Sequence, residues 1–244
     1  MENKYQKYSS LLYDATKPPG TSVDGDLEFY KEYILPVEGK VLEAGVGNGR
    51  MLIPFLKYKV DIIGIDKSNE MLELCEEHLK NNNLKSELIC QSLETFCRPD
   101  EFEAIIMPNA SFNLIETREK ALIILQNYFT SLKKNGFVMI DLIFPSEFKV
   151  GVSHKLKHNV FDLEIEVENI SKSINWEEQY SLTEVNYYID STLKETQNFK
   201  MSWYGIEEFK MILSNLGFSK IEVIKNYNKK SFINLKTATF IAYK

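Results

Sequence analysis

Residues 41–50 read VLEAGVGNGR, a short apolar run followed by three glycines that alternate with other residues. A strand that runs into a glycine-rich turn and then a helix brings backbone N–H groups close to a ligand. The turn is not a dinucleotide fingerprint, because the last glycine of that pattern would fall at Arg50, and it lacks the Gly-Lys-Ser/Thr ending of a phosphate-binding loop. Glu43 places a carboxylate beside the turn, which suits a ligand with positive charge better than a pyrophosphate.

The next apolar run, DIIGID at residues 61–66, ends in Asp66. A carboxylate at this place in such a fold can accept hydrogen bonds from both hydroxyls of a ribose. A nucleoside with a cationic tail would satisfy Glu43 and Asp66 together, and this combination indicates S-adenosylmethionine. Each feature also has a plain structural interpretation, the glycines as a strand–helix turn and Asp66 as an acid at a helix N-terminus.

Strands and helices alternate along the first 145 residues and again at the end of the chain. Ser68 begins one helical apolar period, and Thr117 begins a longer one that Gly136 is expected to end. Such alternation predicts a parallel sheet covered on both faces. The fold we expect is α/β and Rossmann-like, a mostly parallel seven-stranded sheet with helices on both faces. Its strands are expected at residues 40–44, 61–66, 86–90, 103–107, 137–143, 221–224 and 237–242.

The pattern changes after Pro145. Between residues 161 and 168, apolar residues alternate with acidic ones, a period of two that is typical of half-exposed antiparallel strands. The sequence therefore predicts an antiparallel β insert after the fifth strand. We expect a cofactor-binding domain made of residues 1–149 and 205–244, and an insert of residues 150–204 that is either a substrate lid or a dimer surface.

The composition predicts a cytoplasmic protein with reduced thiols. The 244 residues carry a formal net charge of −6, which argues against a general nucleic-acid binder. No stretch approaches the roughly 18 to 20 apolar residues of a membrane span, and the first residues lack an apolar signal region. The three cysteines form no C-x-x-C pair, and no His, Cys and Asp cluster has metal-ligand spacing, so we expect neither disulfides nor a metal.

Four segments together resemble a known family: VLEAGVGNGR, IIGIDKSNEML, FEAIIMPNASFNLI and NGFVMIDLIFP. In order and spacing they are similar to the motifs of class I S-adenosylmethionine-dependent methyltransferases. The resemblance covers about residues 5–145, together with the closing helix and two strands. Within that family the chain looks most like small-molecule methyltransferases with an antiparallel insert after strand five, such as sugar-nucleotide amine N-methyltransferases.

The resemblance implies a set of cofactor-binding residues. The glycines would wrap the methionine part of S-adenosylmethionine, Glu43 would orient the turn and the amine, and Asp66 would hold the ribose. Ser92 stands where the family usually has an acid for the adenine amino group, a departure for which Gln91 or a backbone carbonyl can substitute. The expected cofactor site is Glu43, Gly45, Gly47, Gly49, Arg50, Asp66, Lys67, Met71, Gln91, Ser92, Leu93, Pro108 and Asn109.

The acceptor side is less well defined by sequence. In this fold the exit of the fourth strand, residues 108–113, faces the transferring methyl group. The expected substrate-binding residues are Tyr13, Ser111, Asn113, Trp203 and Tyr204. No catalytic residue is predicted, although Tyr13, His154 or an acid of the insert could serve as a base.

The function we expect is transfer of a methyl group to a small-molecule N or O acceptor by in-line displacement. Positioning the acceptor about 3 Å from the methyl in a dry cavity can supply much of the rate. Two alternatives remain, an RNA or protein methyltransferase and a non-catalytic nucleoside-binding protein of the same fold. A homodimer is also compatible with the insert's edge strands.

Overall fold

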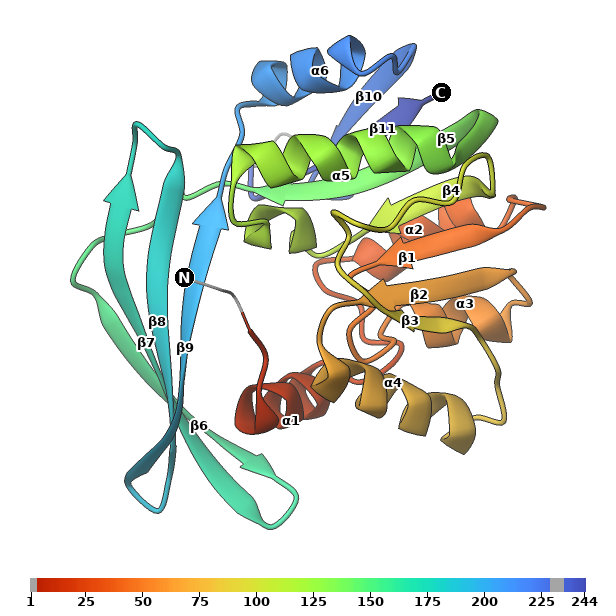
Figure 1. Ribbon diagram of the computed structural model, residues 1–244. Coiled ribbons are helices and arrows are strands. Elements are labelled where there is room, and N and C mark those ends of the chain that lie inside the picture. Colours follow the sequence, from red (N-terminus) through yellow and green to blue (C-terminus); the bar gives the residue numbers. More distant parts are fainter. Residues whose placement is uncertain (1–3, 229–234) are drawn as a thin grey trace.

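The computed structural model describes residues 4–228 and 235–244. Its larger sheet has seven strands in the order β10-β11-β5-β4-β1-β2-β3. This confirms the predicted Rossmann-like sheet (Figure 1). The strands are β1 (Val41–Ala44), β2 (Ile62–Asp66), β3 (Leu88–Cys90), β4 (Phe102–Met107), β5 (Leu132–Ile143), β10 (Lys220–Lys225) and β11 (Thr237–Tyr243).

Strand direction places four strand ends at one edge of the sheet. β1 runs parallel to β2 and β4, and β4 runs parallel to β5. In the described part of this sheet only β11 runs opposite to the other strands, because it pairs antiparallel with both β5 and β10. The carboxyl ends of β1, β2, β4 and β5 therefore meet at one edge, where open α/β sheets bind ligands.

Helices cover both faces of this sheet because residues alternate between them along each strand. On one face, Leu42 and Ile105 belong to a core with α5 (Arg118–Ser131) and α6 (Ile206–Asn215). On the other, Val41 and Ala104 belong to a core with α2 (Asp26–Ile34), α3 (Leu52–Lys57) and α4 (Asn69–Asn81).

One predicted helix boundary is wrong. α5 begins after Thr117, as expected, but it ends at Ser131, and Gly136 lies inside β5. A Cβ at Gly136 would lie 2.8 Å from the backbone oxygen of Glu103, so this glycine permits close approach of β4 and β5. Its function is strand packing rather than helix termination.

The insert is a separate sheet of four antiparallel strands, as predicted. It stands beside the larger sheet, next to the strand ends (Figure 1, left). The apolar alternation between residues 161 and 168 puts Ile165 and Val167 in its small core. The strands are β6 (Ser153–Val160), β7 (Leu163–Asn175), β8 (Tyr180–Ile189) and β9 (Thr192–Ser202).

The first helix, α1 (Lys7–Thr16), connects the insert to the larger sheet. Glu195 of β9 accepts hydrogen bonds from the backbone N–H groups of Tyr8 (2.8 Å) and Ser9 (3.4 Å) at the start of α1. Near the other end of α1, Asp14 Oδ1 lies 2.7 Å from both Asn48 Nδ2 and His78 Nε2. α1 is therefore fixed between the insert on one side and the glycine turn and α4 on the other.

No helix in the described ranges is both long and apolar enough to cross a membrane.

Candidate active site

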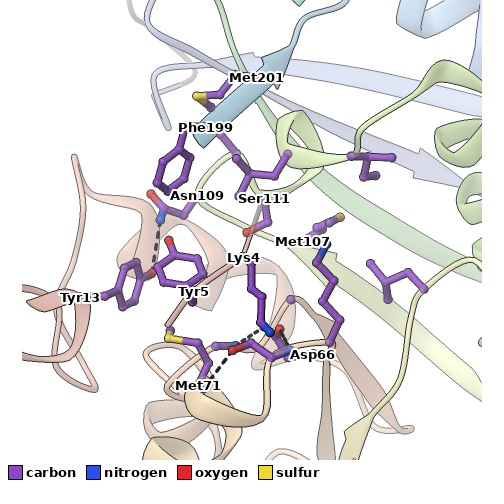
Figure 2. Close-up of a pocket in the computed structure, with 18 of the residues that line it drawn as sticks. Lys4, Tyr5, Tyr13, Asp66, Met71, Met107, Asn109, Ser111, Phe199 and Met201 are labelled. Atoms are coloured by element: carbon purple, nitrogen blue, oxygen red, sulfur yellow. Dashed lines mark hydrogen bonds between the residues drawn. The ribbon is translucent and has the colours of Figure 1, made fainter. Parts of the chain in front are cut away.

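A cavity of about 1020 Å³ lies at the carboxyl edge of the larger sheet. Its floor comes from the ends of β1, β2 and β4, and its far wall comes from β9 of the insert and from α1 with the residues before it. Figure 2 shows Asp66 and Met71 at one end, and Tyr5, Tyr13 and Phe199 gathered around Asn109 at the other. Segments far apart in the sequence thus enclose one site.

The three glycines of the turn all have positive φ, which few other residues adopt, but they have different surroundings. Gly45 and Gly47 line the cavity. A Cβ on Gly47 would lie 3.1 Å from Met71 Cε. Gly49 faces away from the cavity, where a Cβ would lie 2.8 Å from Cys75 Sγ of α4. Two glycines therefore open the ligand site, and the third allows the turn to pack on α4.

Asp66 ends β2 and lines the cavity. Its two carboxylate oxygens accept the backbone N–H groups of Gly47 and Ser68, both at 2.9 Å. Burial raises the pKa of Asp66, and these N–H groups oppose the rise by stabilising the charged form. Each oxygen keeps further acceptor capacity, so Asp66 can still accept hydrogen bonds from a diol.

Glu43 lies beneath the turn and does not line the cavity. It is 2 % exposed, and its Oε2 has no hydrogen-bond partner in the described ranges. Burial raises its pKa to about 8, with Arg50 opposing the rise. An unpaired buried carboxyl next to the cavity fits a ligand that brings positive charge.

Arg50 also lies below the cavity surface rather than in it. Its guanidinium forms a bidentate ion pair with the Asp26 carboxylate, with N–O distances of 2.6 and 3.1 Å. It also donates a hydrogen bond to the carbonyl of Thr21 at 2.8 Å. The expectation that Arg50 contacts the cofactor is corrected by this geometry, since Asp26 already neutralises its charge. The pair attaches the turn to α2.

The predicted adenine side is brought together as expected. Lys67, Met71, Gln91, Ser92 and Leu93 all line the cavity. The Ser92 hydroxyl donates to the carboxylate of Glu94, which also lines it. The sequence departs from the family's acid at residue 92, but an acid reaches the same end of the cavity from two positions further on. The sequence itself shows this acid, Glu94, two residues beyond the expected position.

The exit of β4 divides into residues that face the cavity and residues that support it. Asn109 and Ser111 line it, whereas Pro108 is buried, with its carbonyl accepting the Ser111 hydroxyl at 3.0 Å. Asn113 is also buried, and its side-chain amide donates to the carbonyls of Ile143 (3.1 Å) and Ser202 (2.7 Å). Asn113 therefore joins β5 to β9, and it is absent from the cavity lining.

On the acceptor side Tyr13 lines the cavity as predicted, but Trp203 and Tyr204 do not. Tyr204 is 1 % exposed and packs on Phe112 and Phe209 in the core. Trp203 follows the end of β9 and packs on Trp176, with ring centroids 5.4 Å apart. The predicted substrate residues Trp203 and Tyr204 thus lie just beyond the part of β9 that lines the cavity.

Residues that sequence analysis missed complete the acceptor side. Phe199 and Met201 of β9 line the cavity, two residues apart as alternation along a strand requires. Tyr5 packs edge-to-face on Phe199 and on Tyr13, with centroids 6.2 and 5.8 Å apart. Nothing local marks these side chains as cavity residues. Other cavity residues that the sequence analysis did not name include Lys4, Lys17, Asp24 and Tyr227.

The candidate bases are not equally placed. His154 lies on β6, which contributes nothing to the cavity lining that the structure describes. The acids in that lining come from the larger domain and not from the insert. Burial raises the pKa of Tyr13, while the Asn109 side-chain amide approaches its hydroxyl at 3.5 Å. Within residues 4–228 and 235–244, no group of three His, Cys, Asp or Glu side chains could hold a metal.

Three comparisons with known proteins bear on this cavity. Residues 41–136 match the family model described as a methyltransferase domain. The protein YqeM of Bacillus subtilis (strain 168) is 21% identical over 201 residues, which is 80% of this chain and 80% of YqeM.

Two solved structures extend the likeness to the whole chain. The amino pentose methyltransferase CalS10 of Micromonospora echinaspora, solved with S-adenosylmethionine bound, is 16% identical with a TM-score of 0.73, covering 100% of this chain and 99% of its own. The sugar N-methyltransferase KedS8 of Streptoalloteichus sp ATCC 53650 is 14% identical with a TM-score of 0.77, covering 100% of this chain and 95% of its own. At such identities the likeness shows the shared fold.

The fold and the cavity define an enzyme of the Rossmann-like class, with a nucleoside-type ligand expected at its strand ends. The family-model match identifies the methyltransferase domain within that fold. Residues 41–136 therefore match a methyltransferase domain, and the whole chain shares its fold with methyltransferases such as CalS10, which was solved with S-adenosylmethionine bound.

The cavity residues fit this cofactor. Asp66 has acceptor capacity for a diol, Gly47 leaves space that a side chain would fill, and Glu43 has an unpaired oxygen beneath the turn.

Proposed function

We propose that the enzyme transfers a methyl group to a nitrogen or oxygen of a small molecule. The observation that carries the proposal is the wall facing the strand ends, which is made of Tyr5, Tyr13, Phe199 and Met201. An acceptor must fit between this wall and the end of β4. Ligand cavities usually measure about 300 to 1,000 Å³. A cavity of about 1020 Å³ therefore has room for the cofactor and for an acceptor about the size of a sugar.

In this proposal the larger domain, residues 1–149 and 205–244, holds the cofactor. Asp66 would accept the ribose hydroxyls, Gly45 and Gly47 would lie against the methionine part, and the residues from Gln91 to Glu94 would flank the adenine. The cofactor supplies a methyl group on a cationic sulfur. The chain's own contribution is to hold the acceptor in line with that methyl and to exclude water, which the aromatic wall favours.

The insert, residues 150–204, would select the acceptor. Phe199 and Met201 of β9 present apolar surface to the cavity, and Asn113 fixes the end of β9 to β5. CalS10 and KedS8 are by their titles an amino pentose and a sugar N-methyltransferase, which favours an amino sugar as acceptor.

The test is a methyl-transfer assay with methyl-labelled S-adenosylmethionine. The probes are free and nucleotide-linked amino sugars, the corresponding hydroxyl sugars, total RNA and total protein, with Asp66→Ala as the negative control. Label appearing in an amino or hydroxyl sugar supports the proposal, and mass spectrometry locates the methyl on N or O. Label confined to RNA or protein would overturn the small-molecule proposal, and no label with any probe would leave the nucleoside-binding alternative.

A further inference from the structure

A buried carboxylate, Asp141 of β5, lies directly behind the acceptor side of the cavity. It is fully buried and accepts three hydrogen bonds. The Thr239 hydroxyl donates to Oδ1 at 2.7 Å, and the Tyr227 hydroxyl and the Asn109 backbone N–H donate to Oδ2 at 2.9 and 2.8 Å. Burying a carboxylate costs several kcal/mol unless hydrogen bonds or opposite charges compensate for the lost hydration. The three hydrogen bonds supply that compensation, and the position of this acid suggests a function.

Tyr227 connects this acid to the cavity. It lies just after β10, lines the cavity, and packs its ring on Phe29 at 5.6 Å between centroids. A tyrosine hydroxyl has one proton and also accepts hydrogen bonds. Because that proton is donated to Asp141, the hydroxyl can offer a ligand only its acceptor side.

The backbone at this point is unusual as well. Asn226 and Tyr227 have φ of 50° and 54°, a left-handed conformation that costs roughly 1–2 kcal/mol for a residue with a side chain. Such strain persists where the surroundings hold it, and it is concentrated at functional sites. Here the Tyr227–Asp141 hydrogen bond is one of the contacts that hold it.

The same oxygen of Asp141 fixes Tyr227 and Asn109 relative to each other. Asn109 follows β4 and lines the cavity beside Ser111 and the glycine turn. Figure 2 shows Asn109 at the end of the cavity away from Asp66, the residue proposed to hold the ribose. Because Tyr227 and Asn109 donate to the same oxygen, the Tyr227 hydroxyl lies at this end of the cavity, which the proposed function assigns to the acceptor's nucleophile.

We propose that Tyr227 takes the proton that the acceptor loses, and that Asp141 behind it receives the proton of Tyr227. This inference rests on the proposed function, an N or O acceptor. The acceptor's lone pair forms the new bond to the methyl carbon, and the carbon–sulfur bond breaks with its electron pair remaining on sulfur. The proton on the acceptor atom moves to Tyr227 Oη as the tyrosine proton moves to Asp141 Oδ2. Tyr227 ends neutral, and Asp141 ends protonated.

Charged and titratable groups around the pair are consistent with this direction of transfer. Burial raises the pKa of Asp141 to about 6, opposed by its hydrogen bonds from Thr239, Tyr227 and Asn109. Burial and the nearby Asp141 and Asp26 raise the pKa of Tyr227, whereas Arg50 lowers it. Tyr227 is thus neutral at rest and passes a proton on, while Asp141 is a carboxylate able to receive one near neutral pH.

The test compares Tyr227→Phe with Tyr188→Phe. Tyr188 also donates its hydroxyl to a carboxylate, Glu168, at 3.1 Å, but on the insert and outside the cavity lining. With whichever probe the wild-type enzyme methylates, Tyr227→Phe is expected to lower kcat at least about 100-fold, as loss of a general base does. Its dissociation constant for S-adenosylmethionine, measured by calorimetry, should stay within twofold, and Tyr188→Phe should keep wild-type kcat.

The pH profile supplies the second readout. Wild-type kcat/KM should rise as pH passes through about 6, where Asp141 loses its proton. Asp141→Asn should lack that rise. Tyr227→Phe with wild-type kcat, or an unchanged rise in Asp141→Asn, would overturn the proposal. If Asp141→Asn does not fold, the Tyr227→Phe result decides alone. Activity on RNA or protein only would overturn the proposed function and leave the Tyr227 result to be judged separately.

Discussion

The backbone N–H of Gly47 donates to Oδ2 of Asp66 at 2.9 Å, so the glycine turn after β1 and the acid at the end of β2 form one hydrogen-bonded unit. The carboxylate that is proposed to hold the ribose also holds the turn that is proposed to surround the methionine part. Removing the Asp66 carboxylate should therefore also disturb the glycine turn.

Asp66→Ala is expected to weaken S-adenosylmethionine binding at least about tenfold. The change removes acceptors for two hydroxyls, each hydrogen bond to a charged group being worth about 1.5 to 3 kcal/mol, and it releases the N–H of Gly47. Isothermal calorimetry measures the effect. Asp61→Ala, an exposed acid just before the same strand, is the matched control and should bind like wild type. Equal affinity in both variants would contradict the ribose assignment.

Gly47→Val tests the space beside the turn. Its φ of +54° is unfavourable for valine, and the new Cβ would lie 3.1 Å from Met71 Cε at the cavity surface. We expect a loss of cofactor binding larger than that of Asp66→Ala. Gly151→Val is the control, because Gly151 also has positive φ but a Cβ there would meet nothing within 4 Å. Similar binding by the two variants would contradict a cofactor lying against Gly47.

Glu43 should make cofactor binding depend on pH. With a pKa of about 8, its carboxyl is mostly protonated at pH 7 in the free enzyme. A cationic ligand above it favours the charged form, so binding should release a proton, and affinity should rise as pH increases from about 6 to 8. Calorimetry in buffers of different ionisation enthalpy counts that proton. Glu43→Gln should bind without proton release, and a pH-dependence identical to wild type would exclude Glu43 as its source.

Phe199→Ala is expected to raise the Michaelis constant of the acceptor several-fold more than that of S-adenosylmethionine, because Phe199 belongs to the aromatic wall. Trp203→Ala serves as the control, since Trp203 packs on Trp176 away from the cavity. Steady-state kinetics with both substrates varied distinguishes them. A larger acceptor effect from Trp203 than from Phe199 would restore the sequence-based prediction.

Glu195→Ala should loosen α1, because alanine has no side-chain oxygen to accept the backbone N–H groups of Tyr8 and Ser9. The buried carboxylate acts as a helix cap supplied by a distant strand, and loss of such a cap typically costs about 0.5 to 2 kcal/mol. Urea denaturation should show that loss, together with weaker ligand binding, because Tyr5 and Tyr13 depend on α1 for their position. Glu164→Ala, at an exposed acid of the insert paired with Lys157, should leave both stability and binding unchanged. A loss of stability without any change in binding would mean that α1 is not part of the site.

The fold could be predicted from sequence because its signals are local. Apolar runs mark β1, β2 and β4, glycines mark the turn, and Asp66 stands at a strand end that the run itself defines. The change to period two after Pro145 likewise indicated the insert without any knowledge of its partners.

The acceptor side could not be predicted in the same way, because it depends on which segments meet in space. Tyr204 and Phe199 are both aromatic. Tyr204 lies in the core because it packs on Phe209 of α6, whereas Phe199 lines the cavity. Arg50 resembled a ligand contact until Asp26, 24 residues earlier in the chain, proved to be its partner. No neighbouring residue in the sequence marks Tyr227 as a site residue. Its proposed function depends on the hydrogen bond to Asp141, which lies on another strand.

The Glu195 cap has a consequence for how the protein matures during translation. Tyr8 and Glu195 are separated by 187 positions, so α1 leaves the ribosome long before its cap exists. The strand ends that are proposed to bind the methyl donor belong to β1, β2 and β4, which are complete once residue 107 has been made. A nascent chain can therefore assemble the donor half of the site early, whereas its aromatic wall must wait for β9. The order of synthesis therefore places the completion of the acceptor side after that of the donor side.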